Sequence, residues 1–187
     1  LASLLKECDR ADASIDMFRR SLNEQQSELG ENHVDTLASM EHLAHLYLDC
    51  GHNQDAKEML ERLMALKESL YGEKHKETAV TFETTAALYA KEGMHDDAEK
   101  LFRRALITRE ALFGARHPST TATCMRLACV QKQRKVYDEA EGLFRRVLEV
   151  AEGNLGLLHV SCFEITEHII DINVAVGRLE DRKSTRL

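Results

Sequence analysis

Hydrophobic positions along this chain follow a helical spacing. In residues 76–92 the positions expected to face inward are Ala79, Phe82, Ala86 and Tyr89, at steps of three, four and three residues. In residues 96–113 the corresponding positions are Ala98, Leu101, Phe102, Ala105, Leu106, Leu112 and Phe113. Both sets fit a period of 3.6 residues and not the alternation of a strand. The pattern predicts two helices, which we call the A helix (76–92) and the B helix (96–113).

The same pattern recurs every 42 residues. Each connection between a B helix and the next A helix carries a glycine and a histidine at fixed spacing. The glycines are Gly30, Gly72, Gly114 and Gly156, and the histidines are His33, His75, His117 and His159. One helical pair cannot bury its own apolar face, so repetition predicts that neighbouring pairs stack.

Further positions keep this period and predict how the helices pack. Small residues recur at Ala44, Ala86 and Ala128 and at Ala56, Ala98 and Ala140, which allows the A and B helices to approach closely. Large residues at Phe18, Leu60, Phe102 and Phe144 are expected to fill the gap to the next repeat. Between A and B helices stand Gly51, Gly93 and Gly177, with Lys135 as the exception. Glycine suits the left-handed conformation that ends a helix.

The period divides the chain into a partial repeat 1–30, full repeats 31–72, 73–114 and 115–156, and a partial repeat 157–177. We expect the chain to begin inside an A helix, with Leu1, Leu4 and Leu5 packing on a following B helix. The last A helix is expected over 160–176 and is unusually apolar, as for a helix that another helix covers. Residues 178–187 depart from the pattern and are expected to be a divergent or non-native tail. The chain lacks an initial Met, so we expect a piece of a longer protein that can associate end to end.

The sequence FGARHPSTTA, residues 113–122, contains the chemistry of a reactive site but occurs in related form four times. We therefore interpret it as the link between repeats. Phe113 is expected to close a B helix as a core residue, and Gly114 to break that helix. Pro118 suits the first turn of the next helix, which places His117 near the N-cap. Arg116 is assigned no role.

These positions resemble the tetratricopeptide repeat. Phe82, Ala86, Tyr89, Ala98, Phe102 and Ala105 match that motif's places for bulky, small and aromatic residues. The 42-residue form, with RALITREALFGARHPST at 104–120 as the nearest match, is similar to the repeats of kinesin light chain and nephrocystin. The resemblance implies an all-α, right-handed α-solenoid. It implies a non-catalytic scaffold or adaptor, with a kinesin-light-chain-like role favoured. The alternatives are a nephrocystin-like module on an unseen domain and an enzyme, such as an NTPase, with its catalytic domain elsewhere.

In such solenoids the A helices line a concave groove. The residues expected to face it are Glu41, His45, Leu48, Asp49, Glu83, Ala87, Lys91, Met125, Cys129, Lys132, Glu167 and Asp171. Kinesin light chain carries an Asn-Asn pair that grips the peptide backbone, but this chain has Glu41-His42, Glu83-Thr84 and Met125-Arg126 there. Glu41, Glu83 and Glu167 form an incomplete acidic row that favours a partly basic, amphipathic peptide. The alternative is a solvated polar face without a dedicated ligand.

Composition narrows the remaining function classes. Net charge is −7, which argues against a general nucleic-acid binder, and no apolar run is long enough to span a membrane. Five cysteines at irregular spacing suggest reduced thiols and a cytoplasmic protein. His42 and His45 supply only two ligands on one helix face, and Cys124 and Cys129 do not stack on one face. We predict no catalytic, metal or cofactor site.

Arginine pairs recur on the B helices and suggest a basic ladder for phosphate groups. Acidic residues stand four positions before several of these arginines, as in Glu99–Arg103, Glu141–Arg145, Asp16–Arg20 and Glu58–Arg62. Such spacing forms ion pairs on one helix face. We therefore expect a solvated surface of paired charges.

Overall fold

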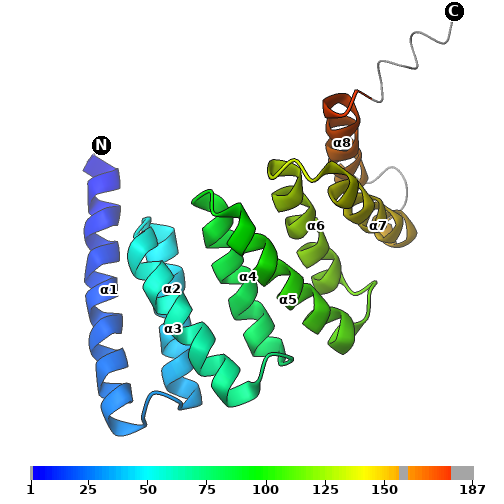
Figure 1. Ribbon diagram of the computed structural model, residues 1–187. Helices are drawn as coiled ribbons and strands as arrows, with labels where there is room; N and C mark the ends of the chain where they lie inside the picture. Colours follow the sequence, from blue (N-terminus) through cyan, green and yellow to red (C-terminus); the bar gives the residue numbers. More distant parts are fainter. Residues whose placement is uncertain (1, 156–159, 178–187) are drawn as a thin grey trace, which may run out of the picture. The chain divides into compact units, whose positions relative to one another are not determined.

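The computed structural model describes residues 2–155 and 160–177. Within these ranges the chain is helical and contains no strand (Figure 1). The helices are α1 (Ala2–Glu28), α2 (Val34–Cys50), α3 (Asn53–Tyr71), α4 (Lys76–Lys91), α5 (His95–Phe113), α6 (Pro118–Gln133), α7 (Tyr137–Leu155) and α8 (Val160–Ala175). The A helices of the repeats are α2, α4, α6 and α8, and α3, α5 and α7 are B helices. The all-α prediction is confirmed.

The helices form two compact units, Leu1–Leu88 and Tyr89–Leu187, and α4 contributes residues to both. We call them unit 1 and unit 2. In unit 1, α2 packs against both α1 and α3. In unit 2, α5 packs against α6, α6 against α7, and α7 against α8. Helices that are neighbours in sequence are therefore neighbours in space within each unit, as a helical repeat requires.

The core of unit 1 consists of the positions that the period marked as apolar or small. Ala44, Ala56 and Leu60 are buried, together with Leu37, Met40, Leu43 and Tyr47 from α2. Alanines at the closest helix approach leave room for the large side chains beside them. Phe18 shares the register of Leu60 but is exposed on α1. The expected gap-filling role therefore fails at that position.

The core of unit 2 follows the same plan, with one correction. Phe102 and Phe144 are buried beside Ala98, Ala128 and Ala140. Phe113, by contrast, is 44% exposed and does not close α5 as a core residue. Its ring stacks on the imidazole of His117, with 4.8 Å between ring centroids. Leu112, in the last turn of α5, is also exposed.

Left-handed residues end the A helices as predicted. Gly51, Gly93 and Gly177 have φ of 78°, 81° and 75°. Lys135 occupies the same place in the turn between α6 and α7, with φ of 63°. A non-glycine residue in this conformation is strained, because its Cβ approaches the following carbonyl. The turn thus forms without glycine, and the conformation of Lys135 costs conformational free energy.

The links between repeats are held by histidine and threonine. His117 is the N-cap of α6, and its Nδ1 accepts a hydrogen bond from the backbone N–H of Ser119 at 3.2 Å. His33 and His75 accept equivalent bonds at 3.3 Å. Thr36 and Thr78 are buried, and each donates its hydroxyl to the carbonyl of the preceding link glycine at 2.9 Å. The predicted N-cap position of His117 is confirmed, and the histidines are structural residues.

The first helix differs from the expected partial repeat. The register predicts an A helix, a turn and a B helix, but α1 runs without interruption from Ala2 to Glu28. The turn glycine of the other repeats has Asp9 as its counterpart. Without a residue that favours the left-handed conformation, the helix continues through this point. The predicted tail, residues 178–187, lies outside the described residues.

Candidate functional site

The predicted groove residues of unit 1 carry less free charge than the sequence suggests. Glu41 on α2 is half-buried, and its carboxylate accepts a hydrogen bond from Lys67 Nζ of α3 at 2.9 Å. Lys67 itself is only 3% exposed, so this pair is largely removed from water. Glu83 on α4 is 7% exposed. In the predicted acidic row, the charge of Glu41 is therefore neutralised by Lys67, and Glu83 is buried.

The other predicted groove residues of α2 and α4 lie closer to solvent. His45, Asp49, Ala87 and Lys91 are exposed, and Leu48 is half-buried. This pattern gives a mixed polar surface in which no charge of one sign predominates.

In unit 2 the predicted groove residues lie on two neighbouring A helices. Lys132 of α6 donates to Asp171 of α8 at 2.7 Å, and its Nζ lies 3.2 Å from His168 Nδ1. The hydrogen bond and charge of Lys132 lower the pKa of Asp171. Cys129 is half-buried, and burial raises the pKa of its thiol. The structure thus connects α6 to α8 through Lys132 and leaves Glu167 exposed.

A hollow of about 500 Å³ lies among α6, α7 and α8 in unit 2. Its walls are mainly apolar and come from three helices: Ala122 and Met125 of α6, Val147 and Val150 of α7, and Glu164 and Ile165 of α8. Met125 was predicted from the sequence to face the groove. The α7 residues were not, because groove positions were taken from A helices alone. We call this space the groove hollow.

The described residues bring no evident reactive group together. Among residues 2–155 and 160–177, no group of three metal-ligating side chains stands close enough to hold an ion. Cys50, Cys124, Cys129 and Cys162 are free thiols, and burial also raises the pKa of Cys124. No helix within these ranges has the length and apolar character needed to cross a bilayer.

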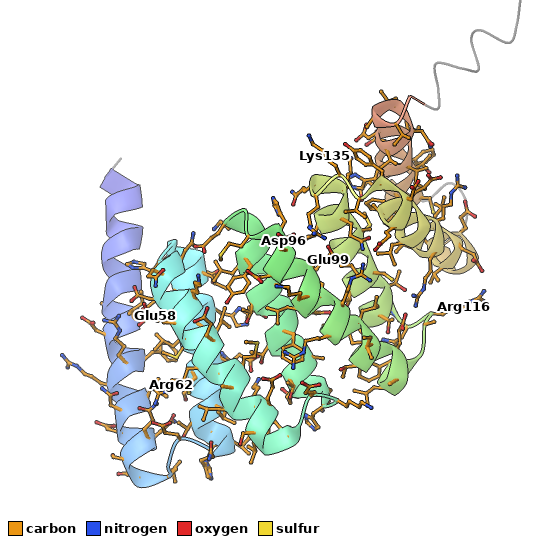
Figure 2. The ribbon with its side chains drawn as sticks, viewed as in Figure 1. Glu58, Arg62, Asp96, Glu99, Arg116 and Lys135 are labelled. Atoms are coloured by element: carbon orange, nitrogen blue, oxygen red, sulfur yellow. The ribbon has the colours of Figure 1, made fainter. Side chains whose placement is uncertain are left out.

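The arginines of the B helices are paired with acids. Arg103 and Arg145 each bind the carboxylate four residues earlier, Glu99 and Glu141, at 2.7 Å. Arg62 of α3 binds Glu31 and not Glu58 as predicted, and the Glu58 carboxylate accepts from Gln54 instead. Arg116, which lies in the link before α6 and was assigned no role from the sequence, binds Glu149 at 2.9 Å. Figure 2 shows Asp96 and Glu99 on α5, which both bind Arg134 in the turn before α7. These contacts support the predicted surface of paired charges.

Comparison with known families accounts for this arrangement. A sequence model of the tetratricopeptide repeat matches residues 1–69, 37–106 and 77–153. The chain belongs to the tetratricopeptide repeat family. The A and B helices, the alanine contacts and the glycine turns described above are the features of that repeat in this chain.

Solved structures show the same fold. A kinesin light chain-like protein of Podospora anserina with nearly identical tetratricopeptide-like repeats superposes with a TM-score of 0.81 at 21% identity, covering 98% of this chain and 87% of that one. BtubC (BKLC) of P. vanneervenii gives 0.80 at 19% identity, covering 98% and 73%. The Yersinia enterocolitica type III secretion translocator chaperone SycD gives 0.61 at 16% identity, covering 81% and 92%. No curated protein matches the chain. At these identities the likeness concerns the fold, which is a tetratricopeptide α-solenoid.

Proposed function

We propose that this tetratricopeptide array is a non-catalytic scaffold or adaptor that binds a peptide segment of a partner protein along its A helices. The observation that carries the proposal is the groove hollow of about 500 Å³ in unit 2. Its volume lies within the range of protein binding pockets, and its walls are mainly apolar. Met125 gives it an adaptable side chain, since methionine is unbranched and polarisable. An apolar anchor of the bound peptide occupies this space.

The charges beside the groove hollow favour a partly basic peptide. Glu164 lines the hollow, and Glu167 is exposed on the same helix. Lys132, the predicted groove cation of α6, is already bound to Asp171. A peptide with an apolar anchor flanked by Lys or Arg therefore meets unbalanced carboxylates on α8, whereas an acidic peptide meets charges of its own sign.

Two synthetic peptides test this preference. They share one pattern of leucines and differ only in having Lys or Glu at the polar positions. Fluorescence anisotropy at low salt is expected to give tighter binding of the Lys peptide. Met125→Lys places a charge in the groove hollow and should abolish that binding. Ala111→Lys adds the same charge to an exposed position of α5 and should not change it. Equal or tighter binding of the Glu peptide contradicts the proposal.

The wider role of such a scaffold depends on what it is joined to. A kinesin-light-chain-like adaptor is favoured, because the Podospora anserina structural neighbour carries that description. The alternative is a nephrocystin-like interaction module attached to a catalytic domain such as an NTPase. A heptad coiled coil in the flanking sequence supports the first, and a G-x-x-x-x-G-K-[ST] motif supports the second.

End-to-end association is a second proposed property, and it rests on α8. Phe163, Ile170 and Val174 are exposed on this helix although they are large and apolar. Ala44, Ala86 and Ala128 share the register of Ile170 and are fully buried. We therefore propose that a second copy of the chain covers this face. Sedimentation velocity should show concentration-dependent dimers that Ile170→Lys abolishes, and a monomer at all concentrations contradicts the idea.

A further inference from the structure

A second hollow, of about 400 Å³, lies among α5, α6 and α7 of unit 2. Its apolar walls are Leu106 and Ile107 of α5, Leu127 of α6 and Leu143 of α7. Ile107 is largely exposed there. No groove residue predicted from the sequence lines this space, which we call the B-helix hollow. It is separate in its lining residues from the groove hollow and from the function proposed above.

Comparison of equivalent repeat positions shows that a tyrosine of the earlier repeats is replaced by glutamine in the B-helix hollow. Gln131 lines it and stands where earlier repeats carry Tyr47 and Tyr89. In unit 1, Tyr47 is buried, and its hydroxyl accepts a hydrogen bond from Arg19 Nε at 2.5 Å. The Arg19 guanidinium also lies 5.4 Å from the Tyr47 ring centroid and 3.7 Å from Asp55.

Unit 2 has the equivalent arginine–carboxylate pair but lacks the aromatic ring. Arg103 stands in the register of Arg19, and Glu139 stands in the register of Asp55. Arg103 and Glu139 form an ion pair, and both line the hollow. Where unit 1 places a phenol ring beside this pair, unit 2 has the shorter Gln131. The chain itself therefore indicates a tyrosine ring as the group that fits beside Arg103.

Gly142 opens the wall of the hollow further. It lies inside α7 and occupies the register of Glu58 and Lys100, which both carry long side chains. A Cβ at Gly142 would meet no atom within 4 Å. Packing therefore does not require glycine here, although glycine weakens a helix interior relative to alanine. What the missing side chain provides is access to the hollow.

The Gln131 side chain also contains a hydrogen-bond acceptor that no donor satisfies among the described residues. Its side chain is 1% exposed, and Nε2 donates to Glu139 at 2.8 Å and to Glu99 at 3.4 Å. Both partners are carboxylates, so the amide orientation is fixed. The opposite atom, Oε1, is buried and has no hydrogen-bond partner among the described residues. A buried acceptor of this kind favours a ligand that brings an O–H or N–H group.

The charges around the hollow are already balanced. Arg103 is paired with Glu99 and Glu139, and Glu110 is paired with Arg146 at 2.5 Å. An uncharged side chain therefore enters without leaving an unpaired ion behind. This favours a neutral aromatic residue over a basic or acidic one.

We propose that the B-helix hollow is a second docking site, which receives a tyrosine side chain from a partner protein. The ring packs against Leu106, Ile107 and Leu143, in the place that Tyr47 takes from within in unit 1. The phenol donates its proton to Gln131 Oε1. Because the two hollows share no lining residue, the array can bind two segments at once.

Two small probes test the chemistry of the site. N-acetyl-L-tyrosinamide and N-acetyl-L-phenylalaninamide differ only in the phenol hydroxyl. Methyl NMR of the whole chain is expected to show saturable shifts at Leu106, Ile107 and Leu143. The tyrosine probe should bind about tenfold more tightly, the range expected for satisfying a buried acceptor.

Variants locate the site without disturbing the groove. Gln131→Tyr supplies the ring from within, as at positions 47 and 89, and should weaken tyrosine-probe binding at least tenfold. Gly142→Met fills the opening and should have the same effect, while circular dichroism shows the helix retained. Gly153→Met, at an exposed position of the same helix, is the matched control and should bind normally. Met125→Lys, which tests the groove, should also bind normally.

Several results would overturn the proposal. One is the absence of saturable shifts, which would mean that water alone serves Gln131. Another is equal binding of the phenylalanine probe, because the hydroxyl would then have no partner. A third is undiminished binding by Gly142→Met. Failure of the groove peptides with retained tyrosine binding would contradict only the proposed function.

Discussion

The turn at Lys135 lacks the glycine found at the equivalent turns of the other repeats. Adding glycine there tests whether the left-handed conformation at this turn costs stability. Three equivalent turns have glycine in the left-handed conformation, whereas Lys135 adopts φ of 63° with a side chain that points into solvent. Figure 2 shows Lys135 at this turn. Lys135→Gly should therefore stabilise the protein, although glycine normally destabilises folded chains.

The magnitude follows from two opposing terms. A left-handed L-residue costs about 1–2 kcal/mol relative to its favoured conformation. Glycine loses more chain entropy on folding, which offsets about 0.5–1 kcal/mol of that gain. The exposed Lys135 side chain contributes little packing. The net gain is about 0.5–1 kcal/mol, which corresponds to a rise in Tm of about 1–4 °C for a chain of this size.

Gly93→Ala is the matched control at the equivalent turn. A Cβ at Gly93 meets nothing within 4 Å, so the substitution adds only backbone strain. It should lower stability by about the amount that Lys135→Gly raises it. Urea unfolding followed by circular dichroism at both variants measures the difference. Unchanged or reduced stability of Lys135→Gly would refute the reasoning.

Three further predictions concern single side chains. His75→Ala should lower the free energy of unfolding by about 1 kcal/mol, because the cap to α4 is lost, whereas His75→Asn should retain most of it in urea titrations. Thr78→Val should cost about 1–2 kcal/mol, because the half-buried carbonyl of Gly72 loses its donor. Thr78→Ser restores the bond, and an unchanged stability of Thr78→Val would contradict the role. Cys129 should react with iodoacetamide only at more alkaline pH than a free cysteine, because burial raises the pKa of its thiol and the reactive thiolate forms at higher pH. Mass spectrometry measures the pH profile of this reaction, and the profile of a free cysteine would count against the half-buried position of Cys129.

Much of the fold was predictable because equivalent positions of the repeats could be compared within one sequence. The turn at Gly93, the N-cap at His117 and the end of α8 before Gly177 follow from local rules applied at one period. The buried threonines were missed although Thr36, Thr78 and Thr120 keep the same period. Thr36 and Thr78 donate to the carbonyl of the preceding link glycine, and Thr120 donates to the Arg109 carbonyl of α5. No local propensity marks these acceptors.

Other features depend on packing that sequence spacing does not contain. Phe113 has the helical spacing of a core residue, but it is the last residue of α5 and is exposed. Glu83 has the register of a groove residue but is buried. The B-helix hollow arises where Gln131 and Gly142 both lack the bulk of their counterparts. Each substitution is visible in the sequence, but only the structure brings the two positions to one space.

In the proposed function, the groove hollow lined by Met125 receives an apolar anchor of a bound segment. The chain has six methionines, so ¹³C-methyl labelling gives a small set of signals, one of them from the hollow. Titration with the leucine–lysine peptide is expected to shift the Met125 methyl signal in a saturable way. The glutamate counterpart should leave that signal in place. Binding of the lysine peptide with an unmoved Met125 methyl would contradict the account.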